Sequence, residues 1–441
     1  MTEEQLINQK FIIKGGNPLF GSVKLKGAKN AIGKIMIASL LTEEEVILSN
    51  VPLNGETEIA VEFCRHIGSE IIRQADKIRI KTPEIKNFKV EGLSRRNRLS
   101  ILALGPLLAR TGEVEVPMVG GDKIGARPVD FHIAALEKMG AEIKIKDTTI
   151  IATTKGLYGS SVVFPYPSVG ATENTILASV LAKGRTVITN AAIEPEIIDL
   201  IKFLQKMGAI IELGSNRQIF IEGVEKLSGV EHKILPDRLE AASFAVMALA
   251  TNGDILVEDA VQEHLIAFLN TVRRLGGGYE VKPDDGIRFF RKGPLQAVHI
   301  ETDTYPGFAT DWQQPTAVLL TQAQGNSIIH ETVFEDRFGY CDDLKRMGAD
   351  IEIHPKCLGG LACRFQGKLY NHSAVIRGPR PLKGTSIEMK DIRAGMAHII
   401  AALVAEGQSE ITGLEHIDRG YENIDGRIKD LGGDISRVDL N

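Results

Sequence analysis

One pattern recurs six times along this chain of 441 residues and constrains its fold more than any other feature. Each copy places a glycine after an apolar stretch of helical period and before a β-branched run, as in KMGAEI. Successive glycines are separated by 72, 68, 68, 72 and 84 residues. Such a period indicates one supersecondary unit used six times. The repeated glycines are Gly68, Gly140, Gly208, Gly276, Gly348 and Gly432.

Each repeat predicts the same order of elements. An apolar segment such as FAVMALA or IIAALVA comes first, an alternating strand follows, and an amphipathic helix ends at the repeated glycine. Glycine is expected there because it adopts the left-handed conformation past a helix C-terminus at little cost. The apolar segments are hydrophobic on nearly every side, which predicts buried helices. Each repeat therefore reads strand, buried helix, strand, amphipathic helix, strand.

The repeats also predict how the chain divides into domains. A chain of 441 residues is too long for one ordinary hydrophobic core, and six repeats divide into two similar lobes of three with a cleft for a ligand. We expect one domain over residues 28–235 and a second from residues 1–27 with 236–441. The boundary near Leu235 follows if the strand that opens each repeat precedes its buried helix. The longer last separation predicts a surface excursion within residues 357–383.

The amino-acid composition argues against a nucleic-acid-binding protein and against a membrane protein. The net charge of −5 gives no sign of nucleic-acid binding, and no apolar run reaches the roughly 18 residues of a membrane span. The polar start MTEEQLINQKF is unlike a signal peptide. Four cysteines in so long a chain fit a reducing compartment, so we expect a cytoplasmic protein.

Two of the cysteines suggest a metal site that the spacing does not support. Cys357 and Cys363 lie close to His354 in the sequence. This spacing matches no standard zinc pattern. We therefore expect free thiols in an irregular segment.

Charged and hydroxyl side chains recur at matched positions, where the buried helices are expected to begin. Backbone N–H groups and the helix dipole favour anions there, and guanidinium groups pair with phosphate or carboxylate through two hydrogen bonds. The pattern predicts binding of a phosphorylated or carboxylated substrate. Any one of these charged side chains, taken alone, could equally belong to a solvated ion pair on the surface. These residues are Lys29, Arg98, Ser168, Asp237, Arg238, Asp311 and Arg393.

Nine motifs along the chain carry a resemblance to a known family. They are GAKNA (27–31), ALGPLLAR (103–110), IGARPVDFH (124–132), PSVGATEN (167–174), EPEIID (194–199), LPDRLE (235–240), TDWQQ (310–314), ETVFEDRF (331–338) and HIDRGYE (416–422). On these motifs the chain resembles the enolpyruvyl transferases of the EPSP synthase superfamily over essentially its whole length. The resemblance implies a two-lobed, inside-out α/β barrel of six βαβαββ-type units, three per domain.

Within that family the chain is most similar to the members that act on UDP-N-acetylglucosamine. The resemblance implies transfer of the enolpyruvyl group of phosphoenolpyruvate to the 3'-hydroxyl of the sugar, through a tetrahedral intermediate and with release of phosphate. This is the first committed step of peptidoglycan synthesis. No metal or organic cofactor is expected, and the implied partners are the two small-molecule substrates, with neither nucleic acid nor membrane. Oligomeric state stays open.

The resemblance also implies roles for individual residues. Those implied in catalysis are Asp122, Asp311, Lys29 and Arg419, and those implied around phosphoenolpyruvate are Lys29, Asn30, Arg127 and Arg419. Those implied along the UDP-sugar are Arg98, Arg127, Pro128, Val129, Asp130, Phe131, Ser168, Val169, Gly170, Asp311, Val333 and Phe334. Arg337 and Arg393 match arginines near the site whose contacts vary with closure.

Asp122 stands where many relatives carry a cysteine, on a mobile loop around 119–128. The family role of this position is proton donation to the enolpyruvyl methylene. Fosfomycin alkylates the cysteine of those relatives, so a chain with aspartate there is expected to resist it.

Two departures keep other readings open. Gly33-Lys34 stands where the family commonly has proline, and Tyr166 stands where relatives have lysine or phenylalanine. An enolpyruvyl transferase with another nucleotide acceptor therefore remains an alternative. A second alternative is an inactive protein that binds a UDP-sugar, against which the retained phosphoenolpyruvate residues argue.

Overall fold

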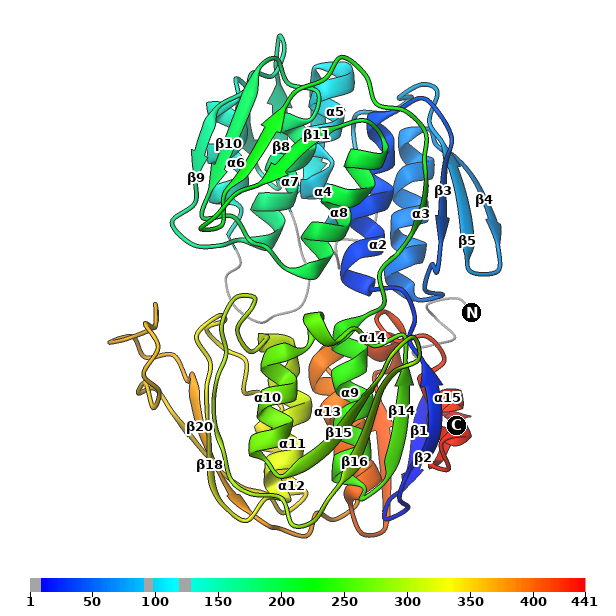
Figure 1. Ribbon diagram of the computed structural model, residues 1–441, viewed down its shortest axis with the longest axis vertical. Helices are drawn as coiled ribbons and strands as arrows, with labels where there is room; N and C mark the ends of the chain where they lie inside the picture. The colour runs from blue at the N-terminus through cyan, green and yellow to red at the C-terminus, as the bar shows by residue number, and fades with distance from the viewer. Residues whose placement is uncertain (1–8, 91–97, 119–127, 441) are drawn as a thin grey trace. The chain divides into compact units, whose positions relative to one another are not determined.

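The chain forms two compact units in a computed structural model that describes residues 9–90, 98–118 and 128–440 (Figure 1). Unit 1 combines residues 9–26 with 236–440, and unit 2 holds the described residues between 27 and 235. The chain passes from one unit to the other between Lys26 and Gly27 and again between Leu235 and Pro236.

Unit 2 carries the first three repeats. The first comprises α2 (Lys29–Ala38), η1 (Ser39–Leu41), β3 (Val46–Ser49), α3 (Gly55–Ile67), β4 (Glu70–Gln74) and β5 (Lys77–Lys81). The second comprises α4 (Leu99–Leu102), α5 (Leu104–Thr111), β6 (Glu113–Pro117), α6 (Asp130–Lys138), β7 (Glu142–Lys146) and β8 (Thr149–Thr153). The third comprises β9 (Ser161–Val163), α7 (Val169–Ser179), β10 (Arg185–Thr189), α8 (Pro195–Lys206), β11 (Ile210–Leu213), β12 (Ile219–Glu222) and β13 (Glu231–Lys233).

Unit 1 carries the last three repeats and the N-terminal strands. The fourth repeat and those strands comprise β1 (Gln9–Lys14), β2 (Phe20–Lys24), α9 (Arg238–Ala250), β14 (Asp254–Glu258), η2 (Gln262–His264), α10 (Ile266–Arg274), β15 (Gly277–Lys282) and β16 (Gly286–Arg291). The fifth comprises β17 (His299–Glu301), η3 (Thr310–Trp312), α11 (Gln313–Thr321), β18 (Gly325–His330), α12 (Cys341–Arg346), β19 (Asp350–His354) and β20 (Ser373–Gly378). The sixth comprises β21 (Ser386–Glu388), α13 (Ile392–Val404), β22 (Gln408–Thr412), α14 (Leu414–Asp418), α15 (Ile424–Asp430) and β23 (Asp434–Asp439).

The repeats share one sheet topology. A parallel pair is extended by two antiparallel strands, as in the order β17-β18-β20-β19. The second repeat has three named strands, and an isolated parallel bridge between Lys89 and Glu115 takes the fourth place. The βαβαββ unit that the resemblance implies is confirmed. Two strands follow the amphipathic helix in every repeat but the sixth, where only β23 follows and the N-terminal β1 takes the other place in the sheet. The six repeated glycines all have positive φ, from 80° at Gly276 to 124° at Gly68, which confirms them as helix stops.

Two sheets take their opening strand from a distant part of the chain. β2, near the N-terminus, pairs in parallel with β14, and β13, after the third repeat, pairs in parallel with β3 of the first. β1 lies between β22 and β23. The expectation that every opening strand directly precedes its buried helix is therefore wrong for the first and fourth repeats. A strand pairs with the sheet whose free edge it reaches, which need not be the sheet of the next helix in the sequence. In this way the last strand of unit 2 completes its first sheet, and an N-terminal strand completes the sheet of the fourth repeat.

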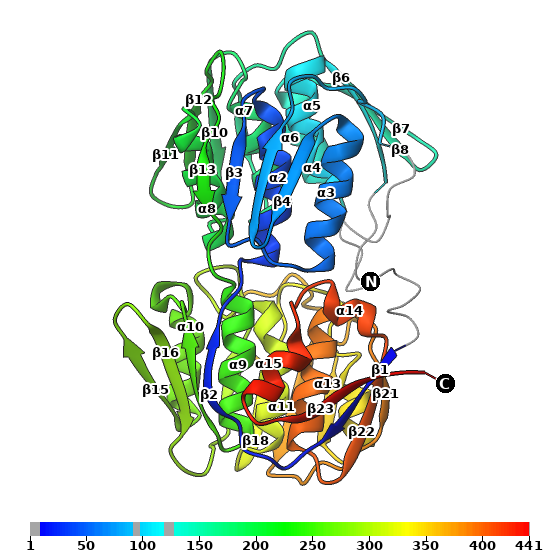
Figure 2. The ribbon, with the colours of Figure 1, turned by 90° about the vertical axis from the view of Figure 1, so that its right-hand side faces the viewer.

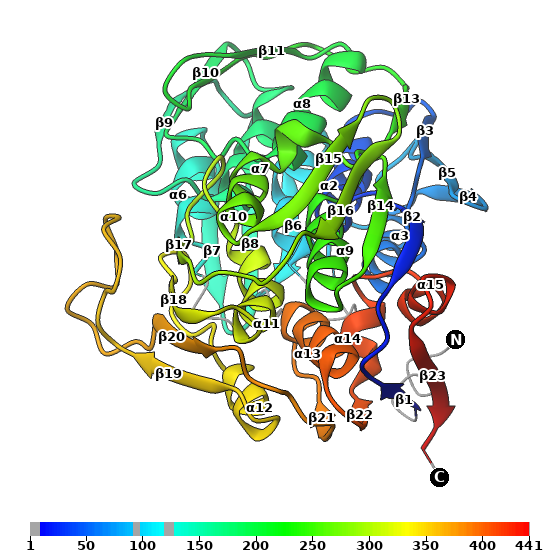
Figure 3. The same cartoon turned by 60° about the horizontal axis from the view of Figure 1, so that its bottom comes forward.

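Each unit has its own hydrophobic core, built on the apolar helices. All 13 residues of α9 are buried, and α9, α11 and α13 pack against one another within unit 1. The sheets enclose these helices (Figures 2 and 3). Their strands alternate, as in β5, where Ile78 and Ile80 are buried between exposed basic residues. This is the inside-out arrangement that the resemblance implies.

The excursion predicted from the last repeat separation lies in the connection from β19 to β20, residues 355–372. β20 itself occupies part of the predicted 357–383 range. Among the described residues, no helix combines the length and apolarity that crossing a membrane requires.

Candidate functional site

The charged residues predicted at helix starts lie at those starts. Lys29 is the first residue of α2, Arg98 is the N-cap of α4 and Ser168 is the N-cap of α7. In unit 1, Asp237 caps α9 and Asp311 lies in η3, directly before α11. Asp122 and Arg127 lie outside the described residues.

In unit 1, two arginines hold the carboxylate of Asp311. Arg337 donates from Nη2 to Oδ1 of Asp311 over 2.6 Å, and Arg393 donates from Nε to Oδ2 over 3.3 Å. Arg337 also donates to the hydroxyl of Thr310 over 2.7 Å. Because each carboxylate oxygen accepts from a different guanidinium, the orientation of Asp311 is fixed on two sides.

The clamp formed by Arg337 and Arg393 on Asp311 is largely buried. The side chains of Arg337 and Arg393 are 4% and 7% exposed, whereas that of Asp311 is 23% exposed. Although burial alone would lower the pKa of Arg393, nearby Tyr421, Asp311 and Asp237 raise it. Arg393 also donates to the Tyr421 hydroxyl over 2.7 Å. Asp311 therefore has the most accessible side chain of the three clamp residues.

Glu331 organises the backbone beside this clamp, and the sequence analysis did not single it out. Its fully buried carboxylate accepts from the hydroxyls of Thr302 and Thr310 over 2.9 and 2.8 Å. It also accepts from the backbone N–H groups of Val333 and Phe334 over 2.8 and 3.1 Å. Glu331 thus shapes the turn that presents Val333 and Phe334. Its place at the start of the ETVFEDRF motif is the signal that would have identified it.

Two further predicted residues of unit 1 have defined positions. The guanidinium of Arg238 lies 5.4 Å from the ring centre of Trp312 and 5.7 Å from that of Tyr305. Arg419 is the C-cap of α14, where its backbone N–H donates to Glu415 over 3.3 Å.

In unit 2, the GAKNA motif places Lys29 beside a buried acid. The ammonium nitrogen of Lys29 lies 3.6 Å from Oε2 of Glu56 and 3.5 Å from Oδ1 of Asn30. Glu56 belongs to the first turn of α3 and was not predicted from the sequence. Two of the four residues that the resemblance implies at phosphoenolpyruvate, Lys29 and Asn30, therefore lie next to each other through their side chains.

Arg98 lies in an environment that keeps a neighbouring histidine neutral. Burial, with the charge of Arg98, lowers the pKa of His132 to about 3. The amide of Asn174 donates to Nδ1 of His132 over 3.2 Å and its oxygen accepts from the backbone of Gly105. A Cβ atom on Gly170 would lie 3.2 Å from the His132 ring, so glycine permits this approach. His132 and Asn174 were missed because each reads as an ordinary helix residue.

The other implied UDP-sugar residues of unit 2 lie at two helix starts. The hydroxyl of Ser168 accepts from the backbone N–H of Ala171 over 3.4 Å, so it caps α7. Val169 packs partly buried against the core. Val129 is the N-cap of α6, and Phe131 lies 6.2 Å from Phe164 between ring centres. Pro128 and Asp130 are exposed beside them.

The departure at Gly33-Lys34 has a structural explanation. A Cβ atom on Gly33 would lie 2.6 Å from Cδ2 of Leu99, so α2 and α4 approach closely there. Lys34 lies 3.8 Å from Oε1 of Glu173, a residue that is 1% exposed. Burial raises the pKa of Glu173 to about 7, Lys34 opposes this shift, and Glu196 and Glu194 add to it. The lysine therefore serves a buried carboxyl group inside unit 2.

The fold is shared with solved structures of enolpyruvyl transferases. An enolpyruvyl transferase, NikO from Streptomyces tendae, is similar in structure, with a TM-score of 0.84 at 20% identity over 98% of this chain and 99% of that one. EPSP synthase from Acinetobacter baumannii is similar with a TM-score of 0.70 at 18% identity, over 98% of this chain and all of that one. Both likenesses establish the fold.

The sequence comparisons give the family. Residues 13–428 match the family described as EPSP synthase (3-phosphoshikimate 1-carboxyvinyltransferase), and the chain belongs to it. Two relatives are named UDP-N-acetylglucosamine 1-carboxyvinyltransferase. That of Protochlamydia amoebophila is 50% identical over 97% of this chain and 94% of its own, and that of Chlamydia abortus is 48% identical over 97% and 98%.

Proposed function

We propose that this chain transfers the enolpyruvyl group of phosphoenolpyruvate to the 3'-hydroxyl of UDP-N-acetylglucosamine in the cytoplasm and releases phosphate. This would be the first committed step of peptidoglycan synthesis. The observation that carries the proposal is the 50% identity, over 97% of the chain, to a relative that bears the name of this activity. The cations at helix starts support it, because both substrates are anionic.

In unit 1, Asp311 is the group proposed to act on the sugar hydroxyl. Two guanidinium groups fix its carboxylate before any substrate binds, so it aligns the 3'-hydroxyl and accepts its proton as the new bond forms. Arg337 and Arg393 act through Asp311 and are positioning residues. Val333 and Phe334 line the UDP-sugar in the turn that Glu331 shapes. Arg419 contacts phosphoenolpyruvate.

In unit 2, Lys29, Asn30 and Arg127 bind phosphoenolpyruvate. Glu56 holds the lysine side chain next to Asn30 until the substrate's charge replaces that contact. The UDP-sugar contacts of this unit are Arg98, Pro128, Val129, Asp130, Phe131, Ser168, Val169 and Gly170.

The chemistry proceeds by addition and elimination. Asp122 gives a proton to the methylene carbon of phosphoenolpyruvate while the 3'-oxygen bonds to the central carbon and its proton passes to Asp311. The tetrahedral adduct then returns a proton from its methyl group to the Asp122 carboxylate and expels phosphate, which restores the double bond. Fixed cations contribute to the rate because they bind the charged adduct more strongly than the separate substrates.

An acceptor comparison tests the activity. Phosphate release from phosphoenolpyruvate is measured with UDP-N-acetylglucosamine, UMP or shikimate 3-phosphate. We expect turnover with UDP-N-acetylglucosamine alone. Faster turnover with another acceptor would assign the chain to another pathway, and UDP-sugar binding without any turnover would identify a binding protein.

A pair of substitutions tests the acid. Asp122→Asn removes the donated proton, and we expect turnover to fall by about 10²-fold or more. Asp122→Cys restores a donor and supplies a thiolate, so we expect it to regain activity and to be inactivated by fosfomycin with time, whereas the native chain resists. Native turnover in the asparagine variant, or a covalent adduct in the native chain, would contradict these roles.

A further inference from the structure

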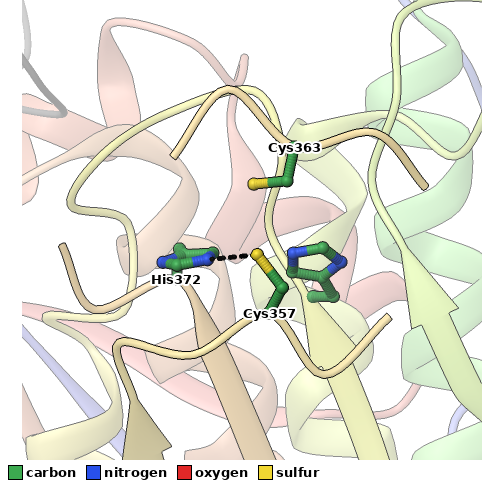
Figure 4. A group of neighbouring side chains, drawn as sticks. Cys357, Cys363 and His372 are labelled. Atoms are coloured by element: carbon green, nitrogen blue, oxygen red, sulfur yellow. Dashed lines mark hydrogen bonds between the residues drawn. The ribbon is translucent and has the colours of Figure 1, made fainter. Parts of the chain in front are cut away.

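The β19–β20 connection of the fifth repeat gathers four side chains that proteins use to bind transition metals. They are His330, Cys357, Cys363 and His372, and one ligand atom from each lies within 4.8 Å of the other three. His330 ends β18, His372 directly precedes β20, and the cysteines come from the connection between them. Figure 4 shows Cys357 and Cys363 turned toward each other beside His372.

Both histidines have the nitrogen farther from the backbone available to a metal. Nδ1 of His330 lies 3.0 Å from Oε2 of Glu301, and Nδ1 of His372 lies 2.6 Å from the carbonyl oxygen of Tyr370. Since both partners only accept, each Nδ1 carries the proton and each neutral ring keeps a lone pair on Nε2. A carboxylate or carbonyl behind the ring is the usual support for a metal-binding histidine.

The buried nitrogen of His330 has no other explanation among the described residues. The side chain is fully buried, and Nε2 has no hydrogen-bond partner there. A buried polar atom without a partner destabilises the fold, because it has given up its hydrogen bonds to water. The other histidine nitrogen, Nε2 of His372, lies 3.3 Å from Sγ of Cys357, the only partner described for it. The described residues therefore leave Nε2 of His330 open to a ligand and place Nε2 of His372 beside a thiol.

The backbone around the cluster is shaped to fit it. The N–H groups of Gly360 and Leu361 donate to Glu301 over 3.0 and 2.8 Å, which ties the chain between the two cysteines to the support of His330. A Cβ atom on Gly359 would lie 2.1 Å from the Glu301 carboxylate and 2.4 Å from Nδ1 of His330. Only glycine fits this approach.

We propose that these four residues bind one zinc ion. Two thiolates and two imidazoles are a standard tetrahedral set for zinc, and their charges neutralise the ion. Zinc–sulfur and zinc–nitrogen bonds of about 2.3 and 2.0 Å place ligand atoms roughly 3.3–3.8 Å apart, so the ligand atoms approach one another by about 1.5 Å at most on binding. Binding replaces the proton of each thiol and releases it to solvent. His354, the histidine that the sequence suggested, is not in the cluster.

The ion would anchor an excursion that has little core of its own. Leu361, Leu369 and Tyr370 are exposed in it, and Phe365 is its buried aromatic residue. The anchored chain also reaches the proposed substrate turn. The backbone N–H of Glu331 donates to the carbonyl of His372 over 2.7 Å, and Arg364 donates to the carbonyl of Val333. Bound zinc would therefore hold in place the turn of Val333 and Phe334. Any effect of zinc on turnover rests on the proposed function, in which this turn lines the UDP-sugar.

Metal content tests the site independently of activity. The full chain is purified with reductant and without chelator from zinc-supplemented cells, and zinc is measured by mass spectrometry. We expect about one ion per chain in the native protein and in His354→Asn, the matched control, and less than about a tenth in Cys363→Ser or His330→Gln. Cobalt substitution is expected to give strong visible bands with thiolate charge transfer. A native chain that holds neither ion, or a Cys363→Ser variant that keeps its zinc, would overturn the site.

A measurement on the native chain covers variants that do not fold. Alkylation of each cysteine is followed with zinc and after chelation. We expect chelation to speed the alkylation of Cys357 and Cys363 at least tenfold, while the fully buried Cys64 and Cys341 react slowly in both states. Equal rates in both states, or a Cys357–Cys363 disulfide in the reduced preparation, would contradict zinc binding. Loss of zinc without loss of turnover would leave the proposed function intact.

Discussion

At the scale of the residue, Asp311 is the proposed proton acceptor and lies within the described residues, whereas the proposed donor, Asp122, does not. The carboxylate of Asp311 is the one partly exposed group in a cluster with two buried arginines, and those arginines reach it from the 331–338 motif and from α13. Fixed cations on both oxygens give the acid a single orientation. The free energy needed to orient the Asp311 carboxylate is therefore supplied during folding and adds nothing to the activation barrier of the reaction.

Neutralising this acid is expected to impair turnover more than folding. Asp311→Asn removes the charge that two guanidinium groups share, and we expect the turnover number to fall by about 10²-fold or more. Asp342→Asn is the matched control, because that aspartate is 80% exposed and pairs only with Lys345 among the ion pairs of the described residues. Steady-state kinetics measure both variants, and thermal unfolding checks that they are folded. Turnover within twofold of the native chain would remove Asp311 from the mechanism.

A second residue predicts how stability depends on pH. Burial raises the pKa of Glu173 to about 7 from the ordinary value of 4.5. The folded chain therefore binds this proton more tightly than the unfolded chain, so its contribution to stability is complete below pH 4.5 and is lost as pH rises toward about 7. The loss amounts to at most about 3 kcal/mol.

Glu173→Gln is expected to remove this slope and to raise the melting temperature at pH 8. The exposed Glu142 provides the control substitution, Glu142→Gln. Thermal unfolding from pH 4.5 to 8 checks both variants. An unchanged slope in Glu173→Gln would show that other groups cause the pH dependence.

At the scale of the element, close approach between buried helices limits which residues the sequence can use. Gly105 in α5 faces α7, and a Cβ atom there would lie 2.9 Å from the backbone nitrogen of Ala178 and 3.1 Å from the carbonyl oxygen of Asn174. These are backbone atoms, which cannot rotate aside. The helices would have to separate, and the Asn174 side chain supports His132.

Gly105→Ala is therefore expected to destabilise the chain by about 1–3 kcal/mol, as overpacked core substitutions do. Gly293→Ala is the control, since a Cβ atom at Gly293 meets nothing within 4 Å. Urea unfolding of both variants measures the difference in the free energy of unfolding. Equal midpoints for the two variants would contradict the close packing of α5 on α7.

The sequence predicted these elements well where the pattern is local. The buried helices, their polar first residues and the glycines that end the amphipathic helices all follow from periodicity and from the conformational freedom of glycine. It did not predict Glu331, Glu56 or His132, because the value of each depends on partners from other elements. It placed only His354 near the cysteines and predicted free thiols. His330 could not be found in this way, since it lies near the thiols only after β18 and β20 have paired.

At the scale of the whole molecule, the two units differ in how the chain builds them. Unit 2 holds the described residues between 27 and 235, and its last strand, β13, pairs with its first, β3. Unit 1 needs the N-terminal residues, because β2 pairs with β14 and β1 lies between β22 and β23. Phe11, Ile13 and Leu19 from this segment are fully buried in its core.

Fragments are expected to behave accordingly. Residues 27–235 should fold alone, whereas residues 236–441 should fold only when a peptide of residues 1–26 is added. Circular dichroism and thermal unfolding check each fragment. In the control, the peptide of residues 1–26 is added to residues 27–235, where it is expected to have no effect. Cooperative unfolding of 236–441 without the peptide would show that the exchanged strands are dispensable.

The sequence by itself determined the repeated unit, the two-lobed fold class and the chemical character of the residues at the helix starts. Those features follow from spacing along the chain. Only the tertiary structure decided which strands close each unit, that Asp311 is held by Arg337 and Arg393, and that two histidines and two cysteines meet in the fifth repeat. These depend on contacts between residues far apart in the chain, which packing selects and local periodicity does not encode.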